Sequence, residues 1–134
     1  MKLKEWIILE DAYLVALNKP AGMLSIPDRA GSAALKNILA AHYGQIFTVH
    51  RLDKDTSGVM VFAKTEDAHR QLSSLFESRE VAKYYMGLVH GRPPQDSGTI
   101  STGLIEHPVR KGMMATHAKG KPSVTDYEVL ESFR

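Results

Sequence analysis

The amino-acid sequence predicts a mixed α/β fold in a single domain, on the strength of three observations. The chain has 134 residues, of which 43% are hydrophobic, and this size and composition suit one globular domain with a modest core. Short runs of β-branched and aromatic residues alternate with two stretches in which apolar residues recur at helical spacing. No internal repeat or low-complexity stretch divides the sequence, so residues 1–134 are expected to form one domain.

The first third of the chain is expected to contain a β-hairpin, or a strand with a tight turn, followed by a loop and a helix. Two apolar runs, residues 6–9 and 13–17, are separated by two acidic residues, as in strands joined by a tight turn. A proline and a glycine then interrupt the pattern and predict a loop, NKPAG, over residues 18–22. Ser32 is a suitable N-cap for the following helix, which is expected to end at Gly44. The apolar face of this helix holds Leu35, Ile38, Leu39 and His42.

The rest of the chain is expected to add strands and a second helix. Thr65 can cap this helix, whose first turn holds two acidic residues near the positive end of the helix dipole. Its predicted buried stripe consists of Ala68, Leu72, Leu75 and Phe76. Five segments rich in β-branched and aromatic residues are predicted strands: residues 46–49, 59–63, 83–89, 100–105 and 123–133.

Composition argues against several classes of site. The sequence has no cysteine, which excludes a disulfide framework and thiolate metal ligands. Its six histidines are scattered without a His-x-x-x-His pair, so we expect no metal site. No apolar run approaches the roughly 20 residues of a membrane span. The first residues do not resemble a signal peptide either, so a cytoplasmic location is expected.

The net charge of +2 is small, but the positive charges are unevenly distributed. Between His107 and Thr125 there is no acidic residue. The same segment holds two histidines and four cationic side chains, which are Arg110, Lys111, Lys119 and Lys121. A local basic segment of this kind is typical of contact with phosphates, and a solvated loop is the alternative.

The stretch VHRLDKDTSG, residues 49–58, lies between two apolar runs and holds the candidate catalytic residues. In an extended backbone Arg51 and Asp53 project to one side, so the guanidinium and the carboxylate share a site. His50 and Leu52 then project to the other side. An aspartate is an anion at neutral pH, which suits a nucleophile or a base. The alternative is a charged surface turn, and neither a glycosidase nor a serine hydrolase has positive support in the sequence.

The longer stretch HRLDKDTSGVMVFAKT resembles the catalytic motif of RluA-type pseudouridine synthases. In that family His-Arg-Leu-Asp is followed after two residues by Thr-Ser-Gly and by an apolar strand that ends in Ala-Lys. Three other segments are similar to the same family. They are ILEDAYLVALNKPAGMLSIP, VAKYYMGLVHG and GKPSVTDYEVL, at residues 8–27, 81–91 and 120–130. The matches are spaced over nearly the whole chain, which makes the resemblance highly specific.

The resemblance implies isomerisation of specific uridines to pseudouridine in structured RNA, either ribosomal or transfer RNA, without a cofactor or a metal. The implied fold is α/β of the α+β type, with a mixed, largely antiparallel central sheet flanked by helices. Asp53 is the implied catalytic residue, as nucleophile or base, acting on a nucleotide that has been flipped out of its stack. Arg51 resembles the arginine that fills the vacated stack, and Tyr85 resembles the active-site tyrosine.

Other residues of these motifs are expected to bind substrate or to shape the site. Thr56 and Ser57 supply hydroxyl groups for substrate binding. Lys19 is expected to define the loop beside the site, with RNA contact as a second role. His50 is expected to support the motif, and Gly58 to meet a backbone requirement.

The chain departs from the family pattern at its end. Family members continue with a segment containing Gly-Arg-x-His-Gln-Ile-Arg, which supplies a basic residue to the active site, whereas this chain ends at Arg134. We expect residues 1–134 to be the N-terminal portion of a catalytic domain whose sheet is incomplete. A reduced protein, completed by a partner or by self-association along an open sheet edge, is the alternative. The alternative function is a catalytically silent RNA-binding or RNA-chaperone module.

Overall fold

The computed structural model describes residues 2–134 and combines α-helices with antiparallel β-sheets, which confirms the predicted fold class. The chain divides into two compact units, residues 1–84 and 85–134, and each unit holds one sheet. The expectation that they form a single domain stays a prediction. Within residues 2–134 no helix has the length and apolar character needed to cross a membrane.

The sheet of the first unit is built on the predicted hairpin. After a short helix α1 (Leu3–Trp6), which the sequence pattern did not indicate, strands β1 (Ile7–Glu10) and β2 (Leu14–Lys19) pair antiparallel. The Asp11 carboxylate closes the turn between them, because it accepts the backbone N–H groups two and three residues later at 2.7 and 2.8 Å. The hairpin is therefore confirmed, and its turn is stabilised by an acidic side chain.

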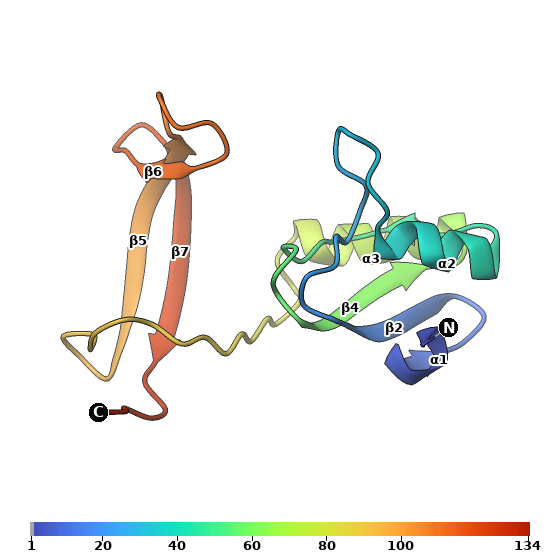
Figure 1. Cartoon of the computed structure of the whole chain (residues 1–134), viewed down its shortest axis with the longest axis horizontal. Helices are drawn as coiled ribbons and strands as arrows, with labels where there is room; N and C mark the ends of the chain where they lie inside the picture. Colours follow the sequence, from blue (N-terminus) through green and yellow to red (C-terminus); the bar gives the residue numbers. More distant parts are fainter. Residues whose placement is uncertain (1) are drawn as a thin grey trace. The chain divides into compact units, whose positions relative to one another are not determined.

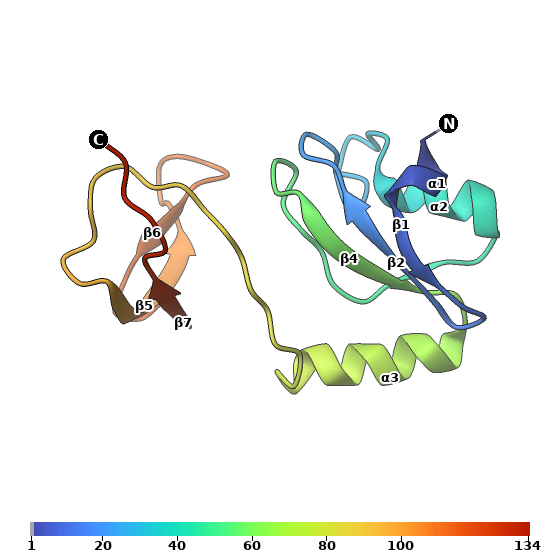
Figure 2. The ribbon, with the colours of Figure 1, turned by 90° about the horizontal axis from the view of Figure 1, so that it is seen from below.

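Two more strands complete this sheet near their predicted places. β4 (Gly58–Ala63) pairs antiparallel along the whole of β2, and the two-residue β3 (Phe47–Thr48) pairs with the other edge of β4. The strand order is β1-β2-β4-β3, and Figure 2 shows β1, β2 and β4 side by side. The loop between β3 and β4, residues 49–57, carries the candidate catalytic residues and is called the motif loop below.

The core of the first unit lies on one face of this sheet. Alternate residues of β2 and β4 are fully buried, as the two-residue period of a strand requires. The helix α2 (Leu35–Tyr43) adds two fully buried leucines to the same cluster. Figure 1 shows α2 and α3 (Glu66–Glu77) on the same side of the sheet. The core residues are Leu3, Val15, Leu17, Leu35, Leu39, Ile46, Leu52, Met60 and Phe62.

The start of α2 differs from the prediction. The sequence predicts Ser32 as the N-cap, but Ala34 holds the cap position. The Ser32 hydroxyl instead donates to the Asp28 carboxylate at 2.7 Å within the preceding loop. The first two N–H groups of the helix donate to the backbone carbonyls of Leu24 and Ser25, at 2.8 and 3.1 Å. Backbone carbonyls thus satisfy the first N–H groups of the helix, and a side-chain oxygen of the first turn accepts the N-cap N–H at 3.0 Å.

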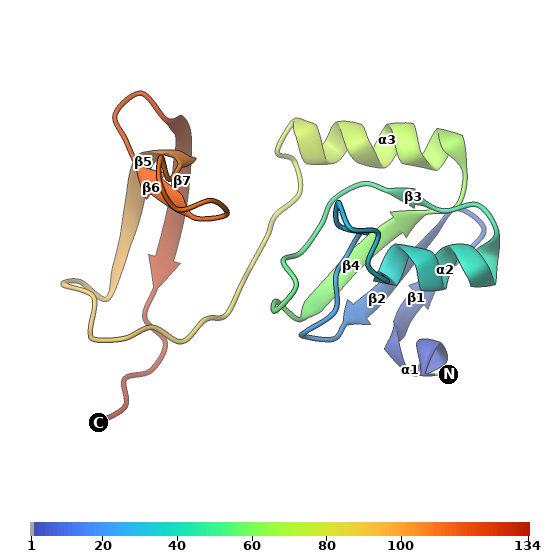
Figure 3. The ribbon, with the colours of Figure 1, turned by 45° about the horizontal axis from the view of Figure 1, so that its top comes forward.

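Helix α3 is confirmed with its predicted cap, although its apolar stripe is less buried than expected. Thr65 Oγ1 accepts a first-turn N–H at 3.2 Å. Ala68, Leu72 and Phe76 are half-buried, whereas Leu75 is exposed at 42%. Figure 3 shows α3 next to β3, and stacked rings join α3 both to β3 and to the motif loop. The stacked pairs are Phe47–His69 and His50–Phe76, with centroid separations of 4.9 and 4.5 Å.

The predicted strand over residues 83–89 is wrong. The segment pairs with no strand among residues 2–134, and its large side chains are exposed, Tyr84 at 94% and Leu88 at 86%. It crosses the boundary between the two units. Apolar and aromatic residues only favour the extended backbone. A strand also requires a neighbouring strand that forms hydrogen bonds with its N–H and C=O groups.

The second unit holds three antiparallel strands in the order β6-β5-β7. β5 (Ser97–Glu106) and β7 (Lys121–Glu128) confirm the two strands predicted for this region, although β7 ends five residues before the predicted end. β6 (Met114–Thr116) was not predicted, because three residues are too few to establish a periodic pattern.

The segment that joins β6 to β7 crosses β5. It must do so because β6 and β7 lie on opposite sides of β5 and both run antiparallel to it. At the crossing His117 N donates to Gly103 O at 2.9 Å. A Cβ atom at Gly103 would overlap the His117 carbonyl oxygen, so the close approach of the two backbones requires glycine there. As a result the β5–β6 and β6–β7 loops lie at the same end of the sheet, as Figure 1 shows.

Candidate active site

The motif loop exposes its charged side chains and is anchored by an apolar one. Leu52 is 7% exposed and belongs to the core, whereas Arg51 and Asp53 on either side of it are exposed. This alternation follows the predicted pattern, with Leu52 facing opposite to its two charged neighbours. No ion pair joins Arg51 to Asp53 within residues 2–134. Both charged groups are therefore accessible to a substrate.

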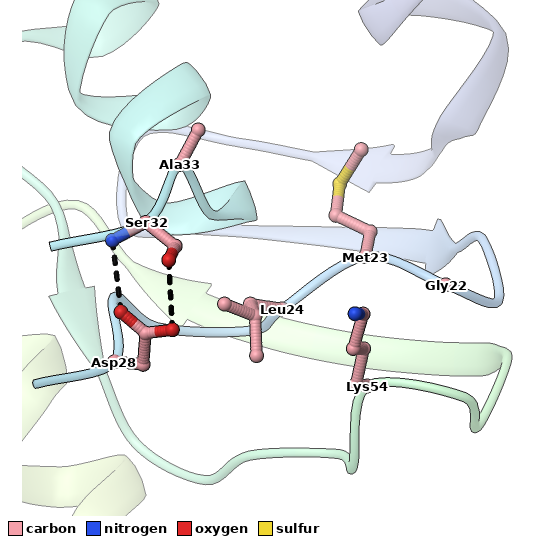
Figure 4. Close-up of a pocket in the computed structure, with 7 residues that line it drawn as sticks. All are labelled: Gly22, Met23, Leu24, Asp28, Ser32, Ala33 and Lys54. Carbon is pink, nitrogen blue, oxygen red and sulfur yellow. Dashed lines mark hydrogen bonds between the residues drawn. The ribbon is translucent and has the colours of Figure 1, made fainter. Parts of the chain in front are cut away.

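A pocket of about 160 Å³ lies between the motif loop and the loop that follows β2. The motif loop contributes residues 51–54 to its wall, Asp53 among them, and the other loop contributes residues 24–28. A more open pocket of about 420 Å³ shares part of this wall. Figure 4 shows the larger pocket, with the Asp28–Ser32 hydrogen bonds on one side and Lys54 on the other.

Lys19, the last residue of β2, clamps these two loops together. Its side chain has no exposed surface, and its Nζ donates three hydrogen bonds to backbone carbonyls. The acceptors are Pro20 O, Met23 O and Lys54 O, at 3.0, 2.7 and 3.0 Å. Burial lowers the pKa of Lys19, and the negative charges of Asp55 and Asp53 oppose that shift.

The ammonium group of Lys19 is not available to bind a substrate. An ammonium group has three N–H donors, and all three are used inside the protein. Direct RNA contact, the second role expected for Lys19, does not fit this geometry. The structural role does, because the acceptor on Lys54 belongs to the motif loop while the other two acceptors belong to the loop after β2.

The end of the motif loop is a tight turn that leads into β4. Thr56 N donates to Asp53 O at 3.1 Å, and Thr56 is half-buried while Ser57 is exposed. Gly58 begins β4 with a φ of +134°, a backbone conformation that other residues rarely adopt. A Cβ atom there would meet nothing within 4 Å, so the requirement for glycine comes from the backbone and not from crowding.

His50 supports the motif loop through a hydrogen bond that requires a neutral ring. Its Nε2 accepts from Val61 N at 3.0 Å, which places the proton of the neutral imidazole on Nδ1. The ring also stacks on Phe76, at an interplanar angle of 10°. Burial lowers the pKa of His50, and the positive charge of Lys83 lowers it further. The folded state therefore favours uncharged His50.

The stability of the first unit is expected to fall as the pH drops below about 6.5, the ordinary pKa of histidine. Because the pKa of His50 is lower in the folded state, the unfolded chain binds this proton more readily, and stability is fully present only above about pH 6.5. One proton contributes a slope of at most about 1.4 kcal/mol per pH unit. Urea unfolding of the parent and of His50→Gln across this range measures the difference, and identical pH profiles would contradict it.

Two predicted features lie in the second unit. Tyr85 precedes β5 in an irregular segment and is 66% exposed, and its expected place in the active site stays a prediction. The four cations of the predicted phosphate-contacting segment are exposed in or beside the two loops at one end of the sheet. We call this group the basic end: Arg110, Lys111, Lys119 and Lys121. Asp126 and Glu128 lie toward the opposite end of β7.

Sequence reasoning missed Ser25, which is 3% exposed and hydrogen-bonded to the backbone of the motif loop. Nothing in its local sequence distinguishes it from an ordinary loop serine. Its partner, Leu52, is 27 residues away, so only the folded chain brings the two together.

The chain thus combines helices and antiparallel sheets in an α+β fold. The exposed side chains of Arg51 and Asp53 lie beside a pocket. The chain belongs to the RNA pseudouridylate synthase family, whose model matches residues 13–134. It is similar to ribosomal large subunit pseudouridine synthase D of Buchnera aphidicola, at 38% identity over 135 residues that cover 96% of this chain and 43% of the relative. The dual-specificity RNA pseudouridine synthase RluA of Vibrio vulnificus is 41% identical over 128 residues, which cover 93% of this chain and 51% of the relative.

Two solved human structures have a similar fold. Human RNA Pseudouridylate Synthase Domain Containing 1 matches with a TM-score of 0.74 and 24% identity over 90% of this chain and 50% of that one. Human RNA Pseudouridylate Synthase Domain Containing 4 matches with a TM-score of 0.70 and 25% identity over 98% of this chain and 56% of that one. The chain spans about half the length of the curated relatives it matches, from 39% to 60%.

Proposed function

We propose that the chain catalyses the isomerisation of specific uridines to pseudouridine in structured RNA, with Asp53 as the catalytic residue. The observation that carries this proposal is the exposed Asp53 beside Arg51 and a pocket, on a loop that is anchored in the core through Leu52. Membership of the RNA pseudouridylate synthase family supports the choice of reaction.

The proposed reaction moves the ribose bond of uracil from N1 to C5. The N1–C1′ bond breaks, the ring turns, the C5–C1′ bond forms, C5 loses a proton and N1 gains one, so the product is an isomer. Asp53 acts as a nucleophile that adds to the sugar or the ring, or as a base that removes a sugar proton. While Asp53 is ionised near C1′, its negative charge stabilises positive character on the sugar as uracil departs.

The target uridine must leave its stack to meet Asp53, because a stacked nucleotide hides the reacting atoms. Extrusion of a nucleotide costs a few kcal/mol. Arg51 is proposed to fill the vacated space, since its exposed planar cation suits both stacking and phosphate pairing. Tyr85 is proposed to stack on the flipped base, and Thr56 and Ser57 to hydrogen-bond to the substrate.

The basic end of the second unit is proposed to contact RNA phosphates. Its four exposed cations occur in a segment, residues 107–125, that contains no acidic residue. Such contacts are independent of sequence and sensitive to salt.

Ribosomal and transfer RNA are both proposed as substrates, and the cytoplasm as the location. Self-association through an unpaired sheet edge is a further proposal, which sedimentation of the chain at increasing concentration tests.

Replacing Lys111 and Lys119 together by alanine is expected to weaken RNA binding and its salt dependence. Each phosphate contact adds roughly 0.7–0.9 to the slope of log K against log salt, so the slope should fall by about 1.5. Fluorescence anisotropy at several salt concentrations measures it. Arg92→Ala is the control, because Arg92 already pairs with Asp96 at 3.2 Å in the same unit. A slope unchanged from that of the parent would contradict phosphate contact.

Release of tritium from RNA that carries uridine labelled at C5 tests the proposed function, since the new C5–C1′ bond expels that hydrogen. Release by the chain would establish isomerisation. The second candidate is a catalytically silent RNA-binding or RNA-chaperone module, which the exposed basic end would also serve. RNA binding without tritium release, at enzyme concentrations that saturate the RNA, would favour the second candidate.

A further inference from the structure

A single buried hydroxyl binds both peptide groups that flank Leu52. Ser25 Oγ donates to Leu52 O at 2.5 Å and accepts from Leu52 N at 3.1 Å. Leu52 N belongs to the peptide unit that joins it to Arg51, and Leu52 O belongs to the unit that joins it to Asp53. The side chain of Ser25 therefore acts on Leu52 as a neighbouring strand would, with one donor and one acceptor.

The backbone of Ser25 is itself fixed to a rigid part of the core. The carbonyls of Leu24 and Ser25 accept the first two N–H groups of α2. The helix is in turn held by Leu35 and Leu39, both of which are fully buried. A continuous series of hydrogen bonds thus connects the first turn of α2, through Ser25, to the motif loop.

The motif loop is also attached near its start, where His50 Nε2 accepts from Val61 N at 3.0 Å, and beyond Asp53. Gly22 N and Lys19 Nζ both donate to Lys54 O, at 2.9 and 3.0 Å. These bonds fix the backbone after Asp53. Ser25 fixes the backbone before it, at the peptide units that determine the directions of the Arg51 and Asp53 side chains.

We propose that Ser25 is a positioning residue for Arg51 and Asp53. Its two hydrogen bonds hold the peptide units on both sides of Leu52, so that the exposed guanidinium and carboxylate keep a constant relative direction at the pocket wall. Ser25 does not itself touch the reacting atoms, because its hydroxyl is buried and committed to the backbone. This inference rests on the proposed function for its catalytic consequence, but not for its structural part.

Ser25→Ala removes both hydrogen bonds and is compared with Ser25→Thr, which keeps the hydroxyl. Ser78→Ala is the matched control, because the Ser78 hydroxyl also donates to a backbone carbonyl, Leu75 O at 3.3 Å, and lies at the end of α3 outside the candidate site. The first measurement is backbone amide exchange by NMR in the folded 134-residue chain. In Ser25→Ala the Leu52 amide is expected to exchange at least about tenfold faster, while amides of β2 and β4 keep their rates.

The second measurement is tritium release with each variant, at RNA concentrations that separate kcat from KM. A displacement of a catalytic group by about 1 Å lowers the rate about 100-fold. Ser25→Ala should therefore lower kcat by about 10- to 100-fold and leave KM nearly unchanged. Ser25→Thr should restore most of the rate, and Ser78→Ala should match the parent. A variant that is merely less folded would lose active protein without the selective change at the Leu52 amide.

Three results would overturn the positioning role. One is an unchanged Leu52 exchange rate in folded Ser25→Ala, and another is faster exchange with an unchanged kcat. The third is an equal loss of kcat in Ser78→Ala. If the parent chain releases no tritium, the proposed function fails, and exchange at Leu52 still decides whether Ser25 holds the motif loop.

Discussion

Replacing Asp53 by asparagine is expected to lower the rate of tritium release from C5-labelled RNA by at least about 10³-fold. Asparagine keeps the size of the side chain and removes the negative charge, so the loss isolates the contribution of the carboxylate. Asp53 is exposed and forms no ion pair within residues 2–134, so the change leaves no buried partner unsatisfied. The melting temperature and RNA affinity should therefore remain close to those of the parent.

The matched control for this change is Asp55→Asn. Asp55 is an exposed carboxylate two positions further along the motif loop, and both carboxylates act on the pKa of Lys19 in the same direction. Loss of charge near Lys19 is therefore common to the two variants, whereas only one loses the proposed catalytic group. Equal rates of tritium release for the two variants would contradict the assignment of Asp53.

Replacing Lys19 by methionine is expected to destabilise the first unit by about 3 kcal/mol, because each buried acceptor left unsatisfied costs about 1–3 kcal/mol. Methionine has a similar length but no donor, so the carbonyls of Pro20 and Met23 lose the lysine ammonium. Lys54 O keeps its bond from Gly22 N at 2.9 Å. Urea unfolding followed by circular dichroism measures the loss as a lower midpoint at an unchanged slope.

Lys64→Met provides the comparison for Lys19. Lys64 also donates to a backbone carbonyl, Asp11 O at 2.7 Å, but within residues 2–134 this is its only carbonyl partner, and its ion pair with Glu10 is partly exposed. Partly exposed pairs contribute roughly 0–1 kcal/mol, so this variant should lose much less stability. If the two variants are equally stable, Lys19 is not the clamp that its hydrogen bonds indicate.

Local sequence was sufficient for most of the regular elements. The hairpin at the start, α3 with its Thr65 cap, and the long strands β5 and β7 each carry a signal within their own residues. The predictions that were wrong have a different cause. Residues 83–89 have the composition of a strand but no neighbour to pair with, and Ser32 is a good cap residue in a place where backbone carbonyls already serve the helix.

In the candidate site, too, some features follow from the local sequence and others only from the fold. The order His-Arg-Leu-Asp determines that Leu52 faces away from its charged neighbours, since alternation is a local property of extended backbone. It also determined the family resemblance, and with it the expectation about Asp53. The sequence could not indicate that Lys19 is buried, because a lysine beside a proline and a glycine is usually a solvated loop residue.

Tertiary structure alone decided what holds the motif loop. Lys19 meets Lys54 O across 35 residues and Ser25 meets Leu52 across 27, and neither partner is implied by the residues around it. The physical reason is that a buried polar group must find a hydrogen-bond partner, while the identity of that partner depends on which segments the core brings together. The sequence by itself thus determined the candidate catalytic residue, and the fold determined the residues that position it.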